Sequence, residues 1–266
     1  MVFSYSQISS YLACPRRYRY QYLEGWQERA TRAAMLFGRA FEQALAAYFR
    51  DEDASAVLLQ EWSAARCNPL EYGRGESWEQ MWQQGVQLLE LFAQQERVRI
   101  LHPERDLQVK ILRRIDSAND FISYIDALGE LDGKRSVIDW KTSASCYVSE
   151  PDGLASLDPQ LICYSWMSGI AEVALVVFVR KRVPEIQYLH ATITSAQREE
   201  FGELVRHTVQ QVGGGHFAAH PGIRFPQTQC LSCPYNGLCL QSQELIARRL
   251  ERAKGADLGW LDELCA

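Results

Sequence analysis

The sequence predicts a mixed α/β fold, because the spacing of its apolar residues changes from helical to strand-like near residue 106. Before this point apolar residues recur at helical spacing, most clearly over 33–49 (AAMLFGRAFEQALAAYF). After it, alternating runs such as 107–115 (LQVKILRRI) indicate strands, and the Asp-Gly pair at 132–133 indicates a β-hairpin. A helical stretch at 158–169 then leads to further strand-like runs. This order favours helices packed on one mixed sheet.

Local signals place the individual elements. The first helix is expected over 6–24, with Ser4 or Ser6 as its cap and a break at Pro15, next to Cys14. Further helices are expected at 54–66, 77–98, 195–212 and 240–254, and further strands at 120–131, 135–143, 174–181 and 185–193. In the strand that begins near residue 107, we expect the apolar residues to share one face: Leu107, Val109 and Ile111.

Length and composition favour one globular domain. The chain has 266 residues, of which 47% are hydrophobic and 23% charged, so it can bury a substantial core. Long disordered stretches are not expected from this composition. We expect a single domain over 1–266, with a mainly helical part (1–105), an α/β core (106–213) and a cysteine-bearing C-terminal part (214–266).

No segment has the character of a membrane span or a signal peptide. The apolar run ALVVFV (174–179) is strand-sized, whereas a membrane helix needs about 20 apolar residues. The first residues, MVFSYSQISS, lack a basic head followed by an apolar core. We therefore expect a cytoplasmic protein with no membrane partner.

The stretch SVIDWKTS places Asp139 and Lys141 inside a run that otherwise predicts a buried strand. Side chains alternate along a strand, so both project from one face, and an ion pair on a solvated face is one interpretation. Asp126 lies in the neighbouring hairpin strand and Glu42 in the helix 33–49, which we expect to cover that face. Three converging carboxylates repel one another and require a hard cation such as Mg²⁺ or Mn²⁺. Such an ion activates water, and Lys141 could orient that water beside a phosphodiester.

Cysteines form a second group. The chain has eight, and Cys230, Cys233 and Cys239 stand within ten residues, with Cys14 as the candidate fourth ligand. Clustered cysteines in a reducing compartment favour a metal site over disulfides. Zinc and an iron–sulfur cluster satisfy these four thiolates equally well. Of the remaining cysteines, three are expected to be buried small hydrophobic residues: Cys67, Cys146 and Cys163.

Basic and aromatic residues alternate after Cys14, although the net charge of −5 does not favour nucleic-acid binding by the surface as a whole. Arg16, Arg17 and Arg19 are the candidates to hold nucleic-acid phosphates, Arg16 and Arg17 above all, and the tyrosines between and after them could stack on bases. The alternative is that the tyrosines pack in the core and the arginines pair with acids. The tyrosines concerned are Tyr18, Tyr20 and Tyr22.

The segment YIDALGELDGKRSVIDWKTS resembles the core of the PD-(D/E)XK nuclease superfamily, in particular its RecB-like branch. That branch combines an aspartate, a hairpin and a D-x-K-T strand with a glycine and a metal ligand on an upstream helix. It also carries a downstream Q-x-x-x-Y, a spacing that Gln160 and Tyr164 match. The resemblance covers about residues 4–240, with two departures. Glu42 stands where most members of the branch have histidine, and Asp139 replaces the glutamate that is commoner in the wider superfamily, although aspartate is normal at this place in the RecB-like branch.

The resemblance implies a restriction-endonuclease-like sheet flanked by helices, with the N- and C-terminal segments joined by a structural 4Fe–4S cluster on Cys14, Cys230, Cys233 and Cys239. It implies a Mg²⁺- or Mn²⁺-dependent DNA exonuclease that works in repair, recombination or CRISPR spacer acquisition, with a helicase or CRISPR adaptation proteins as partners. A catalytically weak DNA-binding module is the alternative, and an iron–sulfur sensor is a third reading. The residues implied in catalysis are Asp126, Asp139, Lys141, Gln160 and Tyr164, and those implied as metal ligands are Glu42, Asp126 and Asp139.

Overall fold

The computed structural model describes residues 1–148, 153–220 and 228–253. The chain forms two compact units, and each is described by itself. The first, which we call the sheet unit, comprises 31–111 and 123–201. The second, the cysteine unit, comprises 1–30, 112–122 and 202–266. The predicted single domain with three consecutive parts stays a prediction; both observed units combine segments that are distant in sequence.

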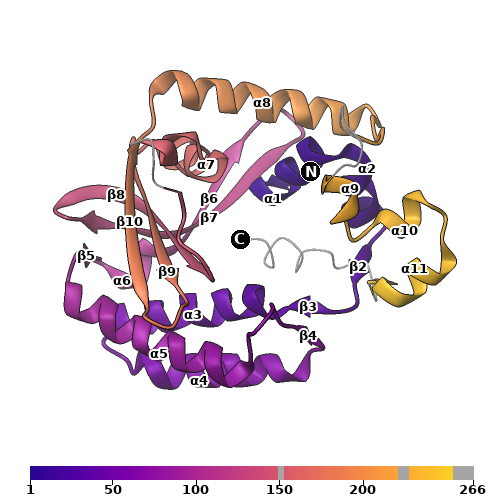
Figure 1. The fold of residues 1–266 in the computed structure, drawn as a ribbon. Coiled ribbons are helices and arrows are strands. Elements are labelled where there is room, and N and C mark those ends of the chain that lie inside the picture. Colours follow the sequence, from indigo (N-terminus) through magenta and orange to yellow (C-terminus); the bar gives the residue numbers. More distant parts are fainter. Residues whose placement is uncertain (149–152, 221–227, 254–266) are drawn as a thin grey trace. The chain divides into compact units, whose positions relative to one another are not determined.

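A mixed sheet organises the sheet unit (Figure 1). Its central strands run in the order β7, β8, β9 and β10, with antiparallel pairing of β7 to β8, parallel pairing of β8 to β9, and antiparallel pairing of β9 to β10. The two-residue strand β5 and the eight-residue strand β6 also pair with β7. The bounds of these strands are β5 Val98–Arg99, β6 Leu107–Arg114, β7 Asp120–Leu131, β8 Lys134–Ser143, β9 Glu172–Val179 and β10 Glu185–Thr192. Two further strands, β3 Thr31–Arg32 and β4 Leu70–Glu71, pair with each other in a separate two-stranded sheet.

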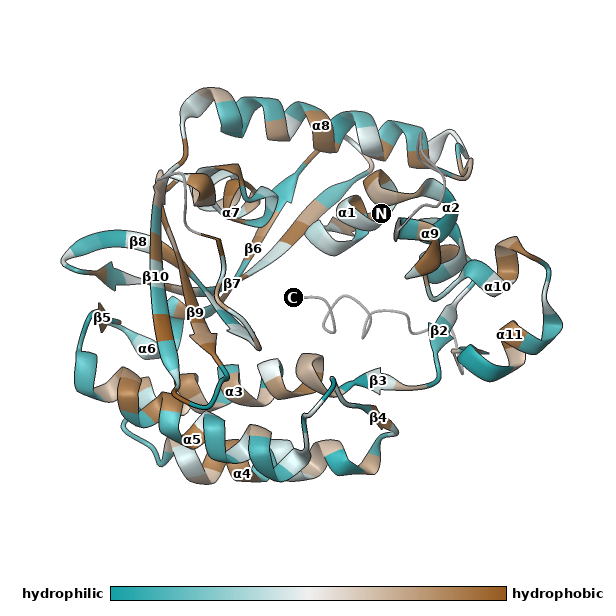
Figure 2. Cartoon of the chain, in the orientation of Figure 1, coloured by the Kyte–Doolittle hydropathy of each residue, from teal (hydrophilic) through white to brown (hydrophobic). Residues whose placement is uncertain are grey.

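Local sequence explains the centre of this sheet. Asp132 and Gly133 join β7 to β8 with φ values of 52° and 78°, the left-handed backbone that a two-residue hairpin turn requires. The predicted hairpin is therefore confirmed. β9 has neighbours on both edges and packs on both faces, so its sequence EVALVVFV is almost entirely apolar and its ribbon is largely brown in Figure 2.

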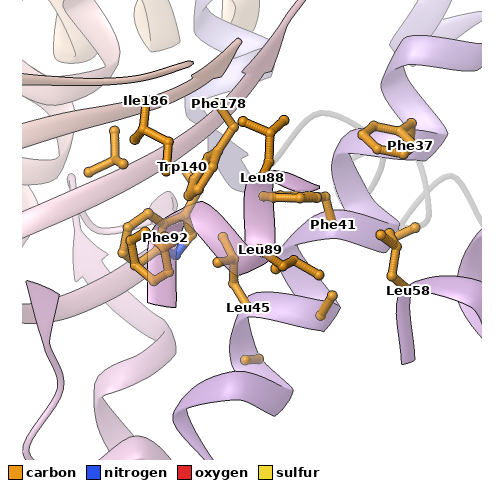
Figure 3. Close-up of a cluster of buried hydrophobic side chains, with 14 of the residues drawn as sticks. Phe37, Phe41, Leu45, Leu58, Leu88, Leu89, Phe92, Trp140, Phe178 and Ile186 are labelled. Atoms are coloured by element: carbon orange, nitrogen blue, oxygen red, sulfur yellow. The ribbon is translucent and has the colours of Figure 1, made fainter. Parts of the chain in front are cut away.

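Helices cover both faces of the sheet. Alternate residues Ile138 and Trp140 of β8 belong to the core shared with α3, α4 and α5 (Figure 3), in which Phe92 and Trp140 have ring centroids 6.0 Å apart. The opposite face, which carries Val137, packs against α7. The bounds are α3 Ala33–Phe49, α4 Ala54–Ala64, η2 Ala65–Cys67, α5 Trp78–Gln95, α6 Pro103–Asp106, η3 Leu154–Leu157 and α7 Pro159–Ser168.

β6 departs from the expected alternation. Leu107 belongs to the core beside α3 and α5, whereas Val109 and Ile111 contact the core beside α7. The reason is Gln108, whose φ of 50° lies in the left-handed region and reverses the side on which the following residues project. The prediction that these three apolar residues share one face is wrong.

The cysteine unit contains the first helix and the C-terminal elements. Ser4 caps α1 by accepting a hydrogen bond from the Gln7 amide, and the helix breaks at Cys14, whose backbone is extended; both predictions are confirmed. β1 pairs in parallel with residues 120–122 at the start of β7. The helix α8, Ser195–Gly213, begins in the sheet unit and continues into the cysteine unit. The other bounds are β1 Val2–Ser4, α1 Tyr5–Ala13, α2 Pro15–Tyr18, η1 Arg19–Leu23, β2 Trp26–Glu28, α9 Thr228–Leu231, α10 Asn236–Cys239, α11 Gln243–Arg249 and β11 Leu250–Arg252.

Two further expectations are corrected. The helix expected over 240–254 is shorter, because Leu250 is buried in a strand, β11, that pairs with β2 from the other end of the chain. Cys163 is buried as expected, but Cys67 and Cys146 are exposed. In the described part of the chain, no helix combines the length and the apolar character needed to cross a bilayer.

Candidate functional site

Asp139 and Lys141 form a close pair on β8. The Lys141 ammonium donates a hydrogen bond to Asp139 Oδ1 at 3.0 Å and lies 2.8 Å from Oδ2. The Asp139 side chain is only 1% exposed, so the face is not the solvated surface of the simple ion-pair interpretation. Burial lowers the pKa of Lys141, but the negative charges of Asp139 and Asp126 outweigh it, so the pKa is raised and the ammonium stays charged.

Asp126 approaches this pair from β7. Its Oδ2 accepts a hydrogen bond from the Trp140 amide at 2.8 Å. Because Trp140 lies between Asp139 and Lys141 in β8, this bond holds the Asp126 carboxylate next to both residues. Burial and the charges of Asp139 and Glu42 raise the pKa of Asp126 well above its usual range. Two carboxyl groups on paired strands are therefore close enough to oppose each other's ionisation.

Glu42 reaches the same region from α3. Its pKa is raised by burial and by the charge of Asp139, while a 3.2 Å hydrogen bond from the Gln108 amide opposes the increase. We expected α3 to cover the face that bears Asp139. Instead α3 packs on the opposite face, and α7 covers the acids, because the alternation of β8 places Asp139 with Val137. Sequence reasoning missed Gln108 because its contact depends on the left-handed backbone within β6.

Gln160 and Tyr164 stand one turn apart on α7. Gln160 Nε2 donates to the Tyr164 hydroxyl at 2.7 Å, and the tyrosine is buried against the acids. Burial and the charges of Asp126 and Asp139 raise the pKa of Tyr164, so its hydroxyl stays protonated. Burial also raises the pKa of Asp139, an increase that Lys141 and a hydrogen bond from Tyr164 oppose. The structure thus brings all six predicted site residues of the sheet unit into one region.

The donor set suits a hard divalent cation. Three carboxyl groups with raised pKa values form a region of negative potential, and oxygen ligands are those that Mg²⁺ and Mn²⁺ prefer. Asp139 Oδ2 is buried and, despite its nearness to Lys141, lacks a partner in hydrogen-bonding geometry, so a lone pair is open to a cation. Among the residues that the structure describes, however, no three acids, histidines or cysteines stand close enough to one point to form a complete ligand set.

The cysteine unit holds the predicted thiolate ligands. The His220 amide lies 3.5 Å from Cys14 Sγ. Burial raises the pKa of Cys233, with smaller increases from the charges of Cys239 and Cys14, whereas a backbone hydrogen bond at Tyr235 and the charge of Arg17 lower it. Cys14, Cys233 and Cys239 therefore influence one another electrostatically, although they come from opposite ends of the chain.

The predicted DNA-binding arginines lie on α2 in the cysteine unit. Arg17 Nε is buried and has no hydrogen-bond partner in the part of the chain that the structure describes. Tyr18 is 1% exposed and packs against Tyr11 and Phe217, with ring centroids 5.6 Å and 6.2 Å away. For Tyr18, the interpretation that the tyrosine packs in the core is therefore correct, and base stacking is not.

Carboxylates and a lysine on the hairpin strands of a mixed sheet are typical of nucleases that hydrolyse phosphodiesters with a metal ion. Residues 2–240 match the family model of the PD-(D/E)XK nuclease superfamily, and the chain belongs to this superfamily. Membership supports a hydrolytic nuclease.

Two solved structures resemble the chain at low identity. One is the crystal structure of a protein from Eubacterium rectale that bears the name "Putative exonuclease", with 13% identity and a TM-score of 0.49 over 98% of this chain and 92% of that chain. The other is the protein SSO0001, with 16% identity and a TM-score of 0.34 over 80% of this chain and 86% of that chain. No curated protein matches the sequence.

Proposed function

We propose that this protein is a Mg²⁺- or Mn²⁺-dependent DNA exonuclease of the RecB-like branch. The observation that carries the proposal is the buried Asp139–Lys141 pair beside Asp126, in a chain that belongs to a nuclease superfamily. Buried acids with raised pKa values destabilise a protein unless a cation or a proton neutralises them. A metal site accounts for their presence.

Each residue has a role in this proposal. Glu42, Asp126 and Asp139 would hold the ion, which when bound would polarise the phosphate and lower the pKa of the attacking water. Lys141, whose raised pKa keeps it charged, would orient that water or stabilise the negative charge that develops on the phosphate. Tyr164 would hold the Asp139 carboxylate in place, and Gln160 would orient the Tyr164 hydroxyl.

We further propose that Cys14, Cys230, Cys233 and Cys239 hold a structural 4Fe–4S cluster, with zinc as the alternative. Support comes from the thiolate donor set, from the mutual influence of three of these cysteines, and from the cationic Arg17 beside Cys233. Such a cluster would join the N-terminal and C-terminal segments of the cysteine unit and so contribute to folding. Arg16 and Arg17 are proposed to contact DNA.

DNA ends or single strands are the proposed substrates. The given sequence contains no P-loop motif for nucleotide hydrolysis. The proposed nuclease would therefore act on DNA ends or single strands that already exist, or on DNA that a helicase has unwound. A helicase or CRISPR adaptation proteins are the proposed partners.

A second candidate function is a DNA-binding module with weak or no catalysis. It is favoured by the incomplete ligand set around the acids and by the hydrogen bond that engages Glu42 with Gln108.

Cleavage of end-labelled single- and double-stranded DNA by anaerobically purified protein, with Mg²⁺, Mn²⁺ or EDTA, separates the two candidates. Asp139→Asn keeps the side-chain volume and removes the charge, and we expect it to reduce metal-dependent cleavage at least about 100-fold. Glu90→Gln, on the exposed surface of α5, is the matched control and should leave activity unchanged. Well-folded wild-type protein that binds DNA without cleaving it would favour the binding module.

A further inference from the structure

Gln187 is a polar residue on the same face of the sheet as the acids, and the proposed function gives it no role. Lys141 of β8 pairs with Val177 of β9, and Val177 pairs with Gln187 of β10. Side chains at paired positions project from the same face of a sheet. Gln187 therefore lies on the face of Lys141 and Asp139, two strands away from the lysine.

Gln187 binds the segment that leaves β8. Its Oε1 accepts a hydrogen bond from the Tyr147 amide at 2.7 Å, and its Nε2 donates to the Tyr147 carbonyl at 3.2 Å. These two bonds satisfy the backbone of Tyr147 as a neighbouring strand would. Between β8 and this point, the Ser143 hydroxyl donates to the Ser145 carbonyl at 2.6 Å and accepts from the Ser145 amide at 3.2 Å, which turns the chain. The chain thus returns over the row that contains Lys141.

The Tyr147 phenol is close enough to Lys141 and Asp139 for their charges to act on it. Burial raises the pKa of Tyr147, the charge of Lys141 lowers it, and the charges of Asp139 and Asp158 raise it further. The pKa of Lys141 is in turn raised in part by Tyr147. Tyr147 is still 38% exposed, and its hydroxyl donates to no group in the described ranges of the chain. An unused hydroxyl donor thus lies at the solvent-accessible side of the site.

We propose that Tyr147 contacts the substrate: its hydroxyl donates a hydrogen bond to a non-bridging oxygen of the DNA phosphate that lies beside Lys141, and Gln187 is the positioning residue that holds it there. The inference rests on the proposed nuclease function. A phosphate is the ligand that fits, because the substrate group beside a charged lysine is anionic and a protonated phenol is a donor. Hydrogen bonds to charged groups are also the stronger kind.

The test compares Tyr147→Phe with Tyr72→Phe in the full-length protein. Tyr72, at 39% exposure, matches Tyr147 in exposure and also lies in the sheet unit, so it controls for the loss of a surface hydroxyl. With end-labelled single-stranded DNA and Mn²⁺, we expect Tyr147→Phe to lower kcat/KM about tenfold or more, at unchanged Tm, and Tyr72→Phe to leave it unchanged.

Gln187→Ala tests the positioning role. We expect it to lower kcat/KM as Tyr147→Phe does, and the double variant to be no worse than Gln187→Ala alone, because both changes remove the same contact. An additive double variant would overturn the role of Gln187. Cleavage by Tyr147→Phe within twofold of the wild type, while Asp139→Asn is inactive, would overturn the role of Tyr147.

Failure of the nuclease proposal is distinguishable from failure of this inference. If the wild type does not cleave, the affinity of the same proteins for fluorescein-labelled DNA, measured by anisotropy in the presence of Ca²⁺, tests the contact directly. Weaker binding by Tyr147→Phe than by Tyr72→Phe would support the phosphate contact without catalysis. Equal binding, or no binding by the wild type, would overturn it.

Discussion

Lys141 Nζ lies 3.0 Å from Asp139 Oδ1, and both side chains project from the same face of β8, where Asp139 is almost fully buried. One ammonium thus faces Asp139 and the neighbouring acids Asp126 and Glu42, whose pKa values are all raised. The positive charge of a single lysine does not neutralise three carboxylates. This imbalance is the physical basis of the predictions for the sheet unit.

The first prediction concerns the pH dependence of stability without divalent metal. A carboxyl group whose pKa is raised on folding binds protons more tightly in the folded state, so its stabilising contribution is present below the unfolded-state pKa of about 4 and is lost as the pH rises through the folded-state value. We therefore expect Asp126 and Glu42 to lower the free energy of unfolding as the pH rises above about 4. Urea unfolding in EDTA measures this slope.

Asp126→Asn should flatten that slope and stabilise the metal-free protein at pH 8, because the amide has no charge to desolvate. Glu90→Gln, an exposed substitution, should keep the wild-type slope. Adding Mn²⁺ should stabilise the wild type more than Asp126→Asn at pH 8. An equal slope in Asp126→Asn and wild type would contradict the raised pKa.

The second prediction tests Glu42 as a metal ligand. The resemblance to the RecB-like branch aligns Glu42 with a histidine of most members. Both Mg²⁺ and Mn²⁺ prefer oxygen ligands, but the less strictly oxygen-selective Mn²⁺ accepts an imidazole nitrogen better than Mg²⁺ does. We expect Glu42→His to retain cleavage within about tenfold in Mn²⁺ and to lose most of its Mg²⁺ activity, whereas Glu42→Ala loses at least about 100-fold with both ions. Equal activity of Glu42→Ala and wild type would show that Glu42 is not a ligand.

The third prediction concerns the cysteines. Cys14→Ser should reduce the iron and sulfide content of anaerobically purified protein, bleach its visible absorbance and lower its Tm, because metal binding contributes to folding. Cys67→Ser, an exposed cysteine in the sheet unit, is the control and should retain the metal. Zinc without iron in the wild type would replace the iron–sulfur proposal with a zinc site.

The fourth prediction concerns a buried ion pair in the sheet unit. Arg180, directly after β9, donates to Glu76 at 2.7 Å, and its side chain is 2% exposed. Removing one partner leaves a charge buried without compensation, so Arg180→Met should lower the free energy of unfolding by about 3 kcal/mol. Arg66 makes an exposed pair with Glu79 at 2.8 Å, and Arg66→Met should cost less than about 1 kcal/mol. If urea unfolding shows similar losses in the free energy of unfolding for both variants, burial does not make the Arg180 pair more important than the exposed one.

Local signals in the sequence identified most of the elements. The helix 33–49 has the bounds that its apolar spacing predicts, and Asp158 and Gly169 cap α7 at its two ends. The Asp-Gly hairpin is present, and its register places Asp126 beside the β8 strand that carries Asp139. These features depend on a few neighbouring residues, so the sequence was sufficient to predict them.

Long-range contacts were not predictable in the same way. β11 pairs with β2 across more than 200 residues, and no local pattern marks Leu250 as a strand residue. The contact of Gln108 with Glu42 depends on a left-handed residue inside β6, and that of Gln187 with Tyr147 on the register of β10.

The sequence by itself determined the order of helices and strands, the carboxylates and lysine of the site, and the superfamily. Only the tertiary structure decided which helix covers the acids, and that Gln108, Asp158 and Tyr147 join them. The physical reason is that caps, turns and periodicity act within one or two turns of the chain. Strand register and side-chain contacts depend on closing long loops, a cost in entropy that only the whole fold repays.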